Sequence, residues 1–344
     1  MSNERPAKFR ICKAIPCSLD LQATSEDEMW AEHGRLAADF TRLHQDVASD
    51  RVTLDDVKLP PVSFLHLKAE LLKSIVKHCH LCEWRCRVDR WAGQRLGACK
   101  LDATPRVSTW FHHYGEEPPL VGTGGSGTIF FTGCVFRCVF CQNWDISQDP
   151  NNGVPVDAKR LALVIDSLAK EGAHNINFVG GEPTPNLHVI AEAMSHVNVN
   201  VSMLWNSDMY LTAEAMRILV DVIDIWLPDF KYGNDKCAVR LSKVMRYFPV
   251  VSRNHALAQD RGDMIIRHLV LPNHVECCTK PVLKWIAENC PRTLVNIMGQ
   301  YRPEYLVPEQ PEKYPDITRR PTSQEMNEAF SYAEELGILY EPVS

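Results

Sequence analysis

The spacing of apolar residues changes along the chain and separates helical regions from mixed ones. Residues 28–44 and 62–77 repeat apolar side chains at helical intervals, for example Phe64, Leu67 and Leu71, which predicts two amphipathic helices. From about residue 126 onward, short runs rich in β-branched and aromatic residues alternate with helical patterns. The predicted strands are residues 128–131, 176–179, 199–205, 223–228, 264–271 and 294–297.

This alternation predicts a parallel sheet made of right-handed βαβ units. The clearest of the intervening helices should begin after Asp157, a suitable N-cap, and end near Gly172, a suitable residue beyond the last turn. Six strands within about 175 residues are too few for an eight-stranded barrel, which typically takes about 250 residues. The expected fold class is therefore α/β, a partial (β/α)6 barrel with parallel strands.

The regions outside this alternation have patterns of their own. We expect residues 1–78 to form a helical N-terminal extension and residues 79–120, which have many cysteines and little periodicity, to form a four-cysteine metal-binding module. Residues 121–300 are the expected α/β core. Residues 301–344 should combine a proline-rich strap with a C-terminal helix, which Thr322 and Glu325 begin as a capping box.

Charge and composition exclude some classes of function. The 344-residue chain has 37 Lys and Arg against 43 Asp and Glu, a formal charge of −6, which disfavours electrostatic binding of nucleic acid or of an anionic membrane. The sequence has no apolar run near the roughly 18–20 residues of a membrane helix. Its first residues also lack the apolar segment of a secretory signal. We therefore expect a cytoplasmic protein with no nucleic-acid or membrane partner.

The chain has thirteen cysteines, and in a reducing compartment clustered cysteines are metal ligands or redox groups more often than disulfides. Four of them, with C-x2-C-x3-C-x12-C spacing, are Cys79, Cys82, Cys86 and Cys99. This set can hold zinc or a second iron–sulfur cluster. We favour zinc, because the spacing lacks the compact C-x2-C-x2-C run of bacterial ferredoxins.

Three further cysteines, Cys134, Cys138 and Cys141, form a C-x3-C-x2-C loop directly after the first predicted strand. This places them at the carboxyl end of a strand, the edge at which α/β folds carry their chemistry. A 4Fe-4S cluster normally takes four cysteines. Three cysteines leave one iron open to bind and activate a ligand, whereas a structural zinc site has a closed fourth position.

We assign no functional role to the remaining cysteines or to two other motifs. Six cysteines are scattered, and of these the adjacent pair Cys277 and Cys278 should be packed rather than a redox pair. Glu116 and Glu117 should lie on a solvated face. Residues 122–127 match G-x-G-x-x-G, but a strand and not a helix follows them, so we reject a dinucleotide site.

The cysteine loop, with the aromatic Phe140 before its last cysteine, resembles the radical S-adenosylmethionine superfamily. The phrases CVFCQNWDIS, FVGGEPTP, WLPDFKYG and RHLVLPNHVECCTKP are similar to uncharacterised homologues of pyruvate formate-lyase activating enzyme. The resemblance implies a 4Fe-4S cluster on Cys134, Cys138 and Cys141 that reductively cleaves S-adenosylmethionine to a 5′-deoxyadenosyl radical. The radical would abstract a hydrogen atom from an unknown protein or small-molecule substrate, with reduced flavodoxin or ferredoxin as electron donor.

The same resemblance assigns cofactor contacts to residues at the ends of the predicted strands. It implies that Glu182 and Lys231 hold the methionine end of the cofactor and that Phe140 packs near its adenine. The full set of implied cofactor-binding residues is Phe140, Gly180, Gly181, Glu182, Asn206, Asp229, Lys231 and Arg267. After the last strand, where activating enzymes have a histidine, this chain reads Met298-Gly299-Gln300-Tyr301. No residue is assigned a catalytic role.

One alternative of another class stays open. A non-catalytic iron–sulfur or zinc scaffold protein would use both cysteine groups. It would have no need for the strand-end motifs at residues 180–182 and 229–231.

Overall fold

The structure is a computed structural model that describes residue 3 and residues 5–341. The outermost ends of the expected N-terminal and C-terminal parts, residues 1, 2, 4 and 342–344, lie outside the described residues. Within the described chain, nine strands form one sheet in the order β3-β1-β2-β4-β5-β6-β7-β8-β9. The strands are β1 (Arg106–His113), β2 (Ser126–Phe131), β3 (Val154–Pro155), β4 (Asn175–Gly180), β5 (Ser202–Ser207), β6 (Ile225–Pro228), β7 (Asp263–Leu269), β8 (Leu294–Met298) and β9 (Tyr340–Glu341).

The six predicted strands correspond to β2 and β4–β8, and they lie side by side in sequence order. All neighbouring pairs from β2 to β9 are parallel. The strands β4, β5 and β6 are almost entirely buried, as expected for parallel strands that helices cover on both faces. The sheet is therefore mixed α/β and mostly parallel.

The strands β1, β3 and β9 were not predicted. β1 runs antiparallel to β2 and β3, and it lies in the cysteine-rich stretch that has little periodicity. Its side chains do not alternate between buried and exposed positions, and Trp110 and Phe111 are about 40% exposed. A period of two, the main sequence signal of a half-buried strand, is therefore absent from β1.

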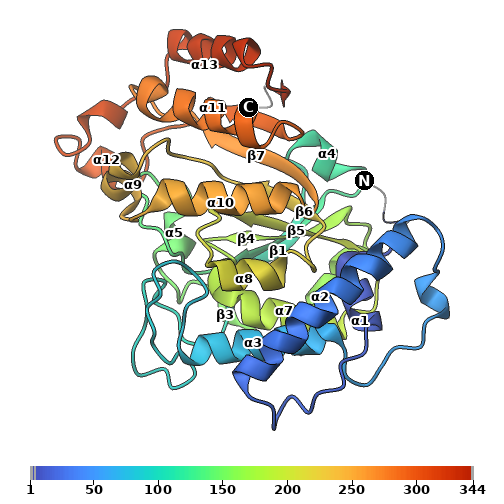
Figure 1. Cartoon of the computed structure of the whole chain (residues 1–344). Helices are drawn as coiled ribbons and strands as arrows, with labels where there is room; N and C mark the ends of the chain where they lie inside the picture. Colours follow the sequence, from blue (N-terminus) through green and yellow to red (C-terminus); the bar gives the residue numbers. More distant parts are fainter. Residues whose placement is uncertain (1–2, 4, 342–344) are drawn as a thin grey trace.

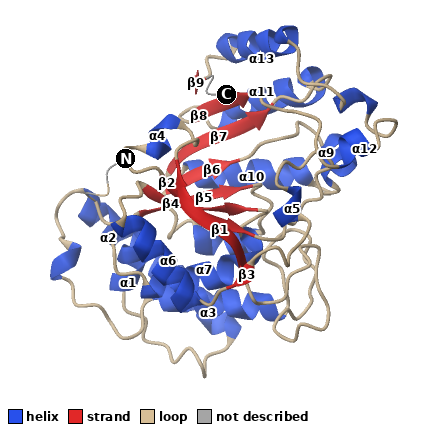
Figure 2. Cartoon of the chain, turned by 180° about the vertical axis from the view of Figure 1, so that it is seen from behind, coloured by secondary structure: helices blue, strands red, loops and turns tan. Residues whose placement is uncertain are grey.

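Helices surround the sheet, and the connections between parallel strands carry α6 to α11 (Figures 1 and 2). The helices are α1 (Lys8–Ala14), α2 (Glu26–Ala48), α3 (Phe64–Lys77), α4 (Pro118–Val121), α5 (Trp144–Ser147), α6 (Ala158–Lys170), α7 (Leu187–His196), α8 (Ala213–Leu219), α9 (Asp235–Ser242), α10 (Tyr247–Gln259), α11 (Lys280–Asn289), α12 (Leu306–Glu309) and α13 (Ser323–Glu335). Short turns of other helix types are η1 (Leu54–Asp56), η2 (Thr184–Asn186), η3 (Val275–Thr279) and η4 (Pro315–Ile317). None of the helices in the described residues has both the length and the apolar character to cross a bilayer.

The ends of two helices follow the sequence prediction. The Asp157 side chain accepts a 2.7 Å hydrogen bond from the Arg160 N–H at the start of α6, and Gly172 beyond the helix has a positive φ of 101°. Thr322 and Glu325 form the predicted capping box at the start of α13. Local sequence signals therefore set these helix boundaries.

The N-terminal helices α1–α3 and the C-terminal helix α13 lie at opposite ends of the molecule (Figures 1 and 2). α3 packs against α7, so the N-terminal helices cover the outer helical layer of the sheet. Their apolar residues, such as Phe9, Leu36 and Leu72, belong to the same continuous hydrophobic core as Ile190 and Trp205 of the α/β region.

A buried ion pair joins α3 to the α/β region. Lys68 Nζ lies 2.7 Å from Asp221 Oδ2, and the side chains of both residues are at most 3% exposed. The same ammonium lies 2.9 Å from His33 Nε2 and donates to the Ile218 carbonyl. Burial and then the Lys68 charge lower the pKa of His33, so this imidazole stays neutral and its Nε2 accepts a hydrogen bond from the ammonium.

Replacing Lys68 with methionine should lower the free energy of unfolding by about 3–5 kcal/mol, because Asp221 would remain buried without its counter-charge. Lys73→Met, in the same helix, is the matched control. Lys73 Nζ lies 3.0 Å from Glu192 Oε1, and both of these side chains are about one-third exposed, so the expected loss is only about 0–1 kcal/mol. Urea unfolding of the two variants measures the difference, and equal losses would contradict a stabilising role for the buried pair.

Candidate functional site

The carboxyl ends of the parallel strands surround one cavity of about 240 Å³. Figure 2 shows these strands ending on the side of the molecule that carries α5 and α9. Eleven of the residues predicted to bind a cluster or cofactor line this cavity: Cys134, Cys138, Cys141, Phe140, Gly180, Gly181, Glu182, Asn206, Asp229, Lys231 and Arg267. The fold thus brings together residues that are up to 133 positions apart, from 134 to 267.

The three cysteines lie on the loop between β2 and α5, with Cys134 and Cys138 buried and Cys141 half-buried. Cys138 Sγ and Ser242 Oγ share a hydrogen bond of 2.9 Å, and Cys141 Sγ and Ser147 Oγ share one of 3.2 Å. Burial raises the pKa of all three thiols. They would be neutral without a metal, and a bound metal ion would deprotonate them.

The backbone of this loop is held from two sides. Arg137 donates from Nη1 to the carbonyls of Cys134 and Phe136, each at 2.7 Å. The backbone N–H groups of Arg137 and Val139 donate to carbonyls at the end of α9, Ser242 and Leu241. The positions of the three thiols are therefore fixed by protein contacts, as a preorganised metal site requires.

Gly180 and Gly181 let the end of β4 lie directly against the cysteine loop. A Cβ at Gly180 would lie 2.2 Å from the Phe131 carbonyl oxygen, and Gly180 has a positive φ of 130°. A Cβ at Gly181 would lie 2.1 Å from the Gly133 carbonyl oxygen and 3.0 Å from Ser147 Cα. All of these neighbours are backbone atoms, so side chains at positions 180 and 181 would displace the loop that carries the cysteines.

We expect Gly181→Ala to destabilise the protein by about 1–3 kcal/mol through overpacking and to lower the iron retained per chain after anaerobic reconstitution. Gly34→Ala is the control, because its Cβ would meet nothing within 4 Å. Within α2, alanine should stabilise the helix by up to about 1 kcal/mol relative to glycine. Thermal unfolding and iron analysis of both variants test this. Unchanged iron and stability in Gly181→Ala would show that the loop tolerates the displacement.

The Glu182 carboxylate is fully buried and accepts hydrogen bonds from protein groups on two strand ends. Its Oε1 accepts from the backbone and the hydroxyl of Thr184 and from the Ser207 hydroxyl at 2.7 Å, and its Oε2 accepts from the Asp208 N–H at 2.9 Å. Burial, and then the charge of Asp208, raise the pKa of Glu182 to about 7. In this structure Glu182 therefore ties the end of β4 to the end of β5 while it lines the cavity.

A chain of alternating charges crosses the cavity wall. Lys231 Nζ bonds to a carboxylate oxygen of Asp208 and lies 2.6 Å from Asp229 Oδ2. Asp229 Oδ1 accepts from Arg267 Nε at 2.8 Å, and Arg267 Nη2 donates to Asn206 Oδ1 at 2.6 Å. Burial opposes the charge on Lys231, but Asp208 and Asp229 outweigh it and raise the pKa of Lys231 well above its usual value.

Asp229 and Lys231 of this network stay charged although they lie inside the protein. Burial opposes ionisation of Asp229, yet the charges of Arg267 and Lys231 outweigh it and lower the pKa of Asp229 to about 2. Asp208 also accepts a 3.7 Å hydrogen bond from the Cys134 thiol. The charged groups at the ends of β5, β6 and β7 are thus connected to the cysteine loop, with Asp208 as the link.

The sequence prediction for Glu116 and Glu117 was wrong. Both side chains are buried below the network, with Glu116 only 8% exposed and Glu117 6% exposed. Glu116 lies 3.1 Å from His113 Nδ1 and 3.9 Å from Arg267 Nη1. Two adjacent acidic residues are usually solvated, and here His113 and Arg267 lie beside Glu116 while Asn296 Nδ2 donates to Glu117 Oε1 at 3.0 Å.

The rest of the cavity wall is less charged. Phe140 is buried and packs edge-to-face on Tyr301, with ring centroids 5.5 Å apart. Leu269, Met298 and Gln300 complete this side, and Gln300 Nε2 donates to Met298 Sδ at 3.1 Å. The segment that lacks the histidine of activating enzymes therefore does reach the cavity, and Gln300 lies there.

The four-cysteine stretch packs directly on the cysteine loop. Trp84 Nε1 donates to the Val135 carbonyl at 2.8 Å, and a Cβ at Gly133 would lie 3.2 Å from the Cys99 carbonyl oxygen. Burial raises the pKa of Cys82, and the nearby thiols of Cys99, Cys79 and Cys86 raise it further. Whether this set holds zinc or a second cluster stays a prediction.

Two comparisons of the sequence decide the family. The sequence profile of the Radical SAM superfamily matches residues 128–286, the segment that carries the cysteine loop and the ends of β4 to β7. The chain is 42% identical to the uncharacterized protein MJ0674 of Methanocaldococcus jannaschii over 344 aligned residues, which cover 98% of this chain and 96% of that protein. The protein belongs to the radical SAM superfamily.

More distant matches to this radical SAM protein cover smaller parts of it. The uncharacterized protein MJ0808 of Methanocaldococcus jannaschii is 24% identical over 57% of this chain and 61% of its own length. The crystal structure of Streptococcus suis SuiB bound to precursor peptide SuiA aligns with a TM-score of 0.44 at 14% identity. That alignment covers 60% of this chain and spans less than half, 46%, of the SuiB chain.

Membership of the radical SAM superfamily implies S-adenosylmethionine and an iron–sulfur cluster as cofactors. The cavity fits both groups. Three thiols, two of them hydrogen-bonded to serine hydroxyls, are the soft donors that such clusters take. The same wall carries the ammonium of Lys231 and the guanidinium of Arg267 for an anionic group, and the phenyl ring of Phe140 for an apolar one.

Proposed function

We propose that this protein is a radical SAM oxidoreductase of the activating-enzyme-like kind. It would reductively cleave S-adenosylmethionine at a 4Fe-4S cluster and use the resulting 5′-deoxyadenosyl radical to abstract a hydrogen atom from a substrate. The parallel strands in sequence order support a partial (β/α)6 barrel as the scaffold. We also propose a cytoplasmic location, and reduced flavodoxin or ferredoxin as the source of the electron.

One observation carries this proposal: the cysteine loop and the strand-end residues named above line a single cavity. Cys134, Cys138 and Cys141 would each bind one iron of the cluster and leave the fourth iron open toward that cavity. A scaffold protein of the alternative class would require the thiols alone. The scaffold alternative does not explain why the charged network of Asp208, Asp229 and Lys231 faces the same cavity as the thiols.

The protein side chains would bind and orient the cofactor. Lys231 and Arg267 supply positive charge on the side of β6 and β7, where they would receive the carboxylate of the methionine moiety. Gly180 and Gly181 let the end of β4 lie directly against the cysteine loop, so this strand end would lie beside the open iron. Phe140, with Leu269 and Met298 nearby, offers an apolar surface for the adenine.

The substrate is proposed only as a protein or a small molecule with a hydrogen atom within reach of the cavity. The four-cysteine stretch, which packs on the cysteine loop through Trp84 and Gly133, would support the loop as a zinc module. As a second cluster it would instead carry electrons to the first one. No side chain of this chain is assigned a catalytic role.

Anaerobic purification followed by iron and sulfide analysis tests the proposal. We expect about four irons per chain for one 4Fe-4S cluster, and a changed electron paramagnetic resonance signal of the reduced cluster when S-adenosylmethionine is added. About eight irons would assign a second cluster to Cys79, Cys82, Cys86 and Cys99. A normal cluster whose signal does not respond to S-adenosylmethionine would contradict the enzyme proposal and favour the scaffold.

A further inference from the structure

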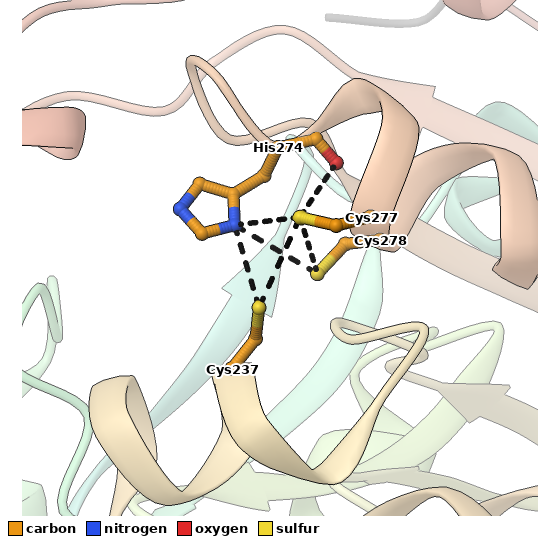
Figure 3. Close-up of side chains that lie close together, drawn as sticks. All are labelled: Cys237, His274, Cys277 and Cys278. Atoms are coloured by element: carbon orange, nitrogen blue, oxygen red, sulfur yellow. Dashed lines mark hydrogen bonds between the residues drawn. The ribbon is translucent and has the colours of Figure 1, made fainter.

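Four residues outside the cavity come together on the connections that follow β6 and β7. Cys237 lies on α9, His274 precedes η3, and Cys277 and Cys278 lie on η3. Figure 3 shows the three sulfur atoms and His274 Nδ1 converging on one point between α9 and η3. From the sequence we expected Cys237 to be a scattered cysteine and Cys277 and Cys278 to be a packed pair, but Cys277 is exposed and the fold brings all three together across the 40 residues that separate Cys237 from Cys277.

The distances among the four atoms are those of ligands that share one metal ion. His274 Nδ1 lies 3.6 Å from Cys237 Sγ, 3.3 Å from Cys277 Sγ and 3.9 Å from Cys278 Sγ. Cys277 Sγ lies 3.9 Å from each of the other two sulfurs, and all four atoms are within 4.8 Å of one another. A tetrahedral zinc site with bonds of about 2.3 Å to sulfur and 2.0 Å to nitrogen has ligand separations of about 3.5–3.8 Å.

We propose that Cys237, His274, Cys277 and Cys278 form a tetrahedral Zn²⁺ site of the Cys3His type. Thiolate and imidazole are the ligands that zinc takes in structural sites, and four protein ligands leave no open position. The site is separate from the cysteine loop and from the four-cysteine stretch, because it uses none of their residues. It therefore stands whether or not the proposed enzymatic function is correct.

The histidine is oriented as zinc-binding histidines are. Its other ring nitrogen, Nε2, lies 2.7 Å from Asp316 Oδ2, and a carboxylate in this position fixes the ring and the tautomer that leaves Nδ1 free for a metal. Asn234 Nδ2 lies 3.8 Å from Cys278 Sγ and donates to the Cys277 carbonyl at 2.7 Å. The site thus has the outer hydrogen bonds that hold ligands in place.

The backbone of η3 explains how adjacent cysteines reach one point. η3 is a π-helix, a rare form that is frequently found at functional sites. Its wider turn brings His274, Cys277 and Cys278 to the same side, so that all three face α9 (Figure 3).

A disulfide explains the arrangement less well. All three cysteines are free thiols, and the sulfur separations of 3.9 Å are far from the roughly 2.05 Å of an S–S bond. A disulfide would also leave the third thiol and His274 without a role, although Asp316 orients that histidine.

The ion would join three segments of the chain that meet near the cavity. α9 follows β6, η3 follows β7, and Asp316 belongs to η4 in the proline-rich strap. The segment between Lys231 and α9 packs tightly on η3, since a Cβ at Gly233 would lie 2.8–2.9 Å from the carbonyl oxygens of Cys278 and Cys277. Zinc here would fix the strap and the backbone next to Lys231.

Zinc analysis of the purified full-length protein and its variants tests the site. We expect Cys277→Ser to contain one zinc less per chain than the parent protein, and this exposed position should tolerate serine. Cys17→Ser, at a buried cysteine on the chain before α2, is the control and should keep all zinc. Because only the difference between variants is counted, zinc in the four-cysteine stretch does not affect the result.

A second pair of variants tests the orienting carboxylate without removing a ligand. Asp316→Asn should weaken zinc binding about 10–100-fold, as loss of such outer partners typically does. Arg240→Gln removes the other charged partner of Asp316 and should leave zinc affinity unchanged. Competition with a coloured zinc chelator measures both affinities.

Two results would overturn the proposal. One is equal zinc content in the parent, Cys277→Ser and His274→Ala proteins. The other is a disulfide among Cys237, Cys277 and Cys278, found by alkylation and mass spectrometry of protein purified without air. Neither result depends on S-adenosylmethionine or on iron, so failure of this site is distinguishable from failure of the enzymatic proposal.

Discussion

Replacing Cys138 with alanine should reduce the formation of 5′-deoxyadenosine to the level seen without protein. The thiol is buried, faces the cavity and shares a 2.9 Å hydrogen bond with Ser242, so its loss removes one of three iron ligands from a site with no spare thiol on the same loop. Activity that depends on an intact cluster is lost entirely with the cluster, which makes this the largest effect that we expect. Chromatography of the products after anaerobic reconstitution and chemical reduction measures it.

The control for this experiment is Cys17→Ala, which removes a buried thiol far from the loop in sequence. It should retain the parent iron content and product formation. If Cys138→Ala still formed 5′-deoxyadenosine at the parent rate, the assignment of Cys134, Cys138 and Cys141 to the cluster would be wrong.

Lys231→Met should weaken the binding of S-adenosylmethionine by about 10–150-fold. A hydrogen bond to a charged group contributes about 1.5–3 kcal/mol, and 1.4 kcal/mol corresponds to a factor of ten in affinity. The same change leaves Asp208 and Asp229 facing each other without the ammonium between them. Without the ammonium, these two carboxylates would repel the anionic group of the cofactor, and this repulsion would lower the affinity further. Anaerobic titration calorimetry measures the affinity.

Lys236→Met, an exposed lysine on α9, removes the same charge without touching the cavity and should bind normally. Thermal unfolding of both variants separates loss of binding from loss of folding. An unchanged dissociation constant for Lys231→Met in a folded protein would show that Lys231 only balances Asp208 and Asp229.

Local patterns in the sequence predicted six of the nine strands in the described residues and the chemistry at the edge of the sheet. Each of the six predicted strands is a short apolar run, and Cys134, Cys138 and Cys141 are close enough in sequence to be recognised as one ligand set. Strand-end residues such as Glu182 and Lys231 could be placed together because the carboxyl ends of parallel strands meet at one edge. These features depend on neighbours within a few residues, or on the rule that orders parallel strands.

Other features depend on contacts between residues that are distant in sequence. β1 lacks the period of two, because its side chains are not alternately buried. Glu116 is buried only because Arg267, 151 positions away, and His113 compensate its charge. Lys68 forms an ion pair with Asp221, which is 153 residues away in the sequence. No local pattern of hydrophobic and polar residues contains this information.

The sequence by itself determined the parallel sheet, the three-cysteine loop and membership of the superfamily, since period, spacing and short motifs encode them locally. Only the tertiary structure decided which charges balance each other in the cavity wall and that Cys237 meets His274, Cys277 and Cys278. The physical reason is that buried charges must lie within a few ångströms of their partners, as must the ligands of one metal ion. The packing of helices on the sheet, rather than distance along the chain, determines which residues come that close.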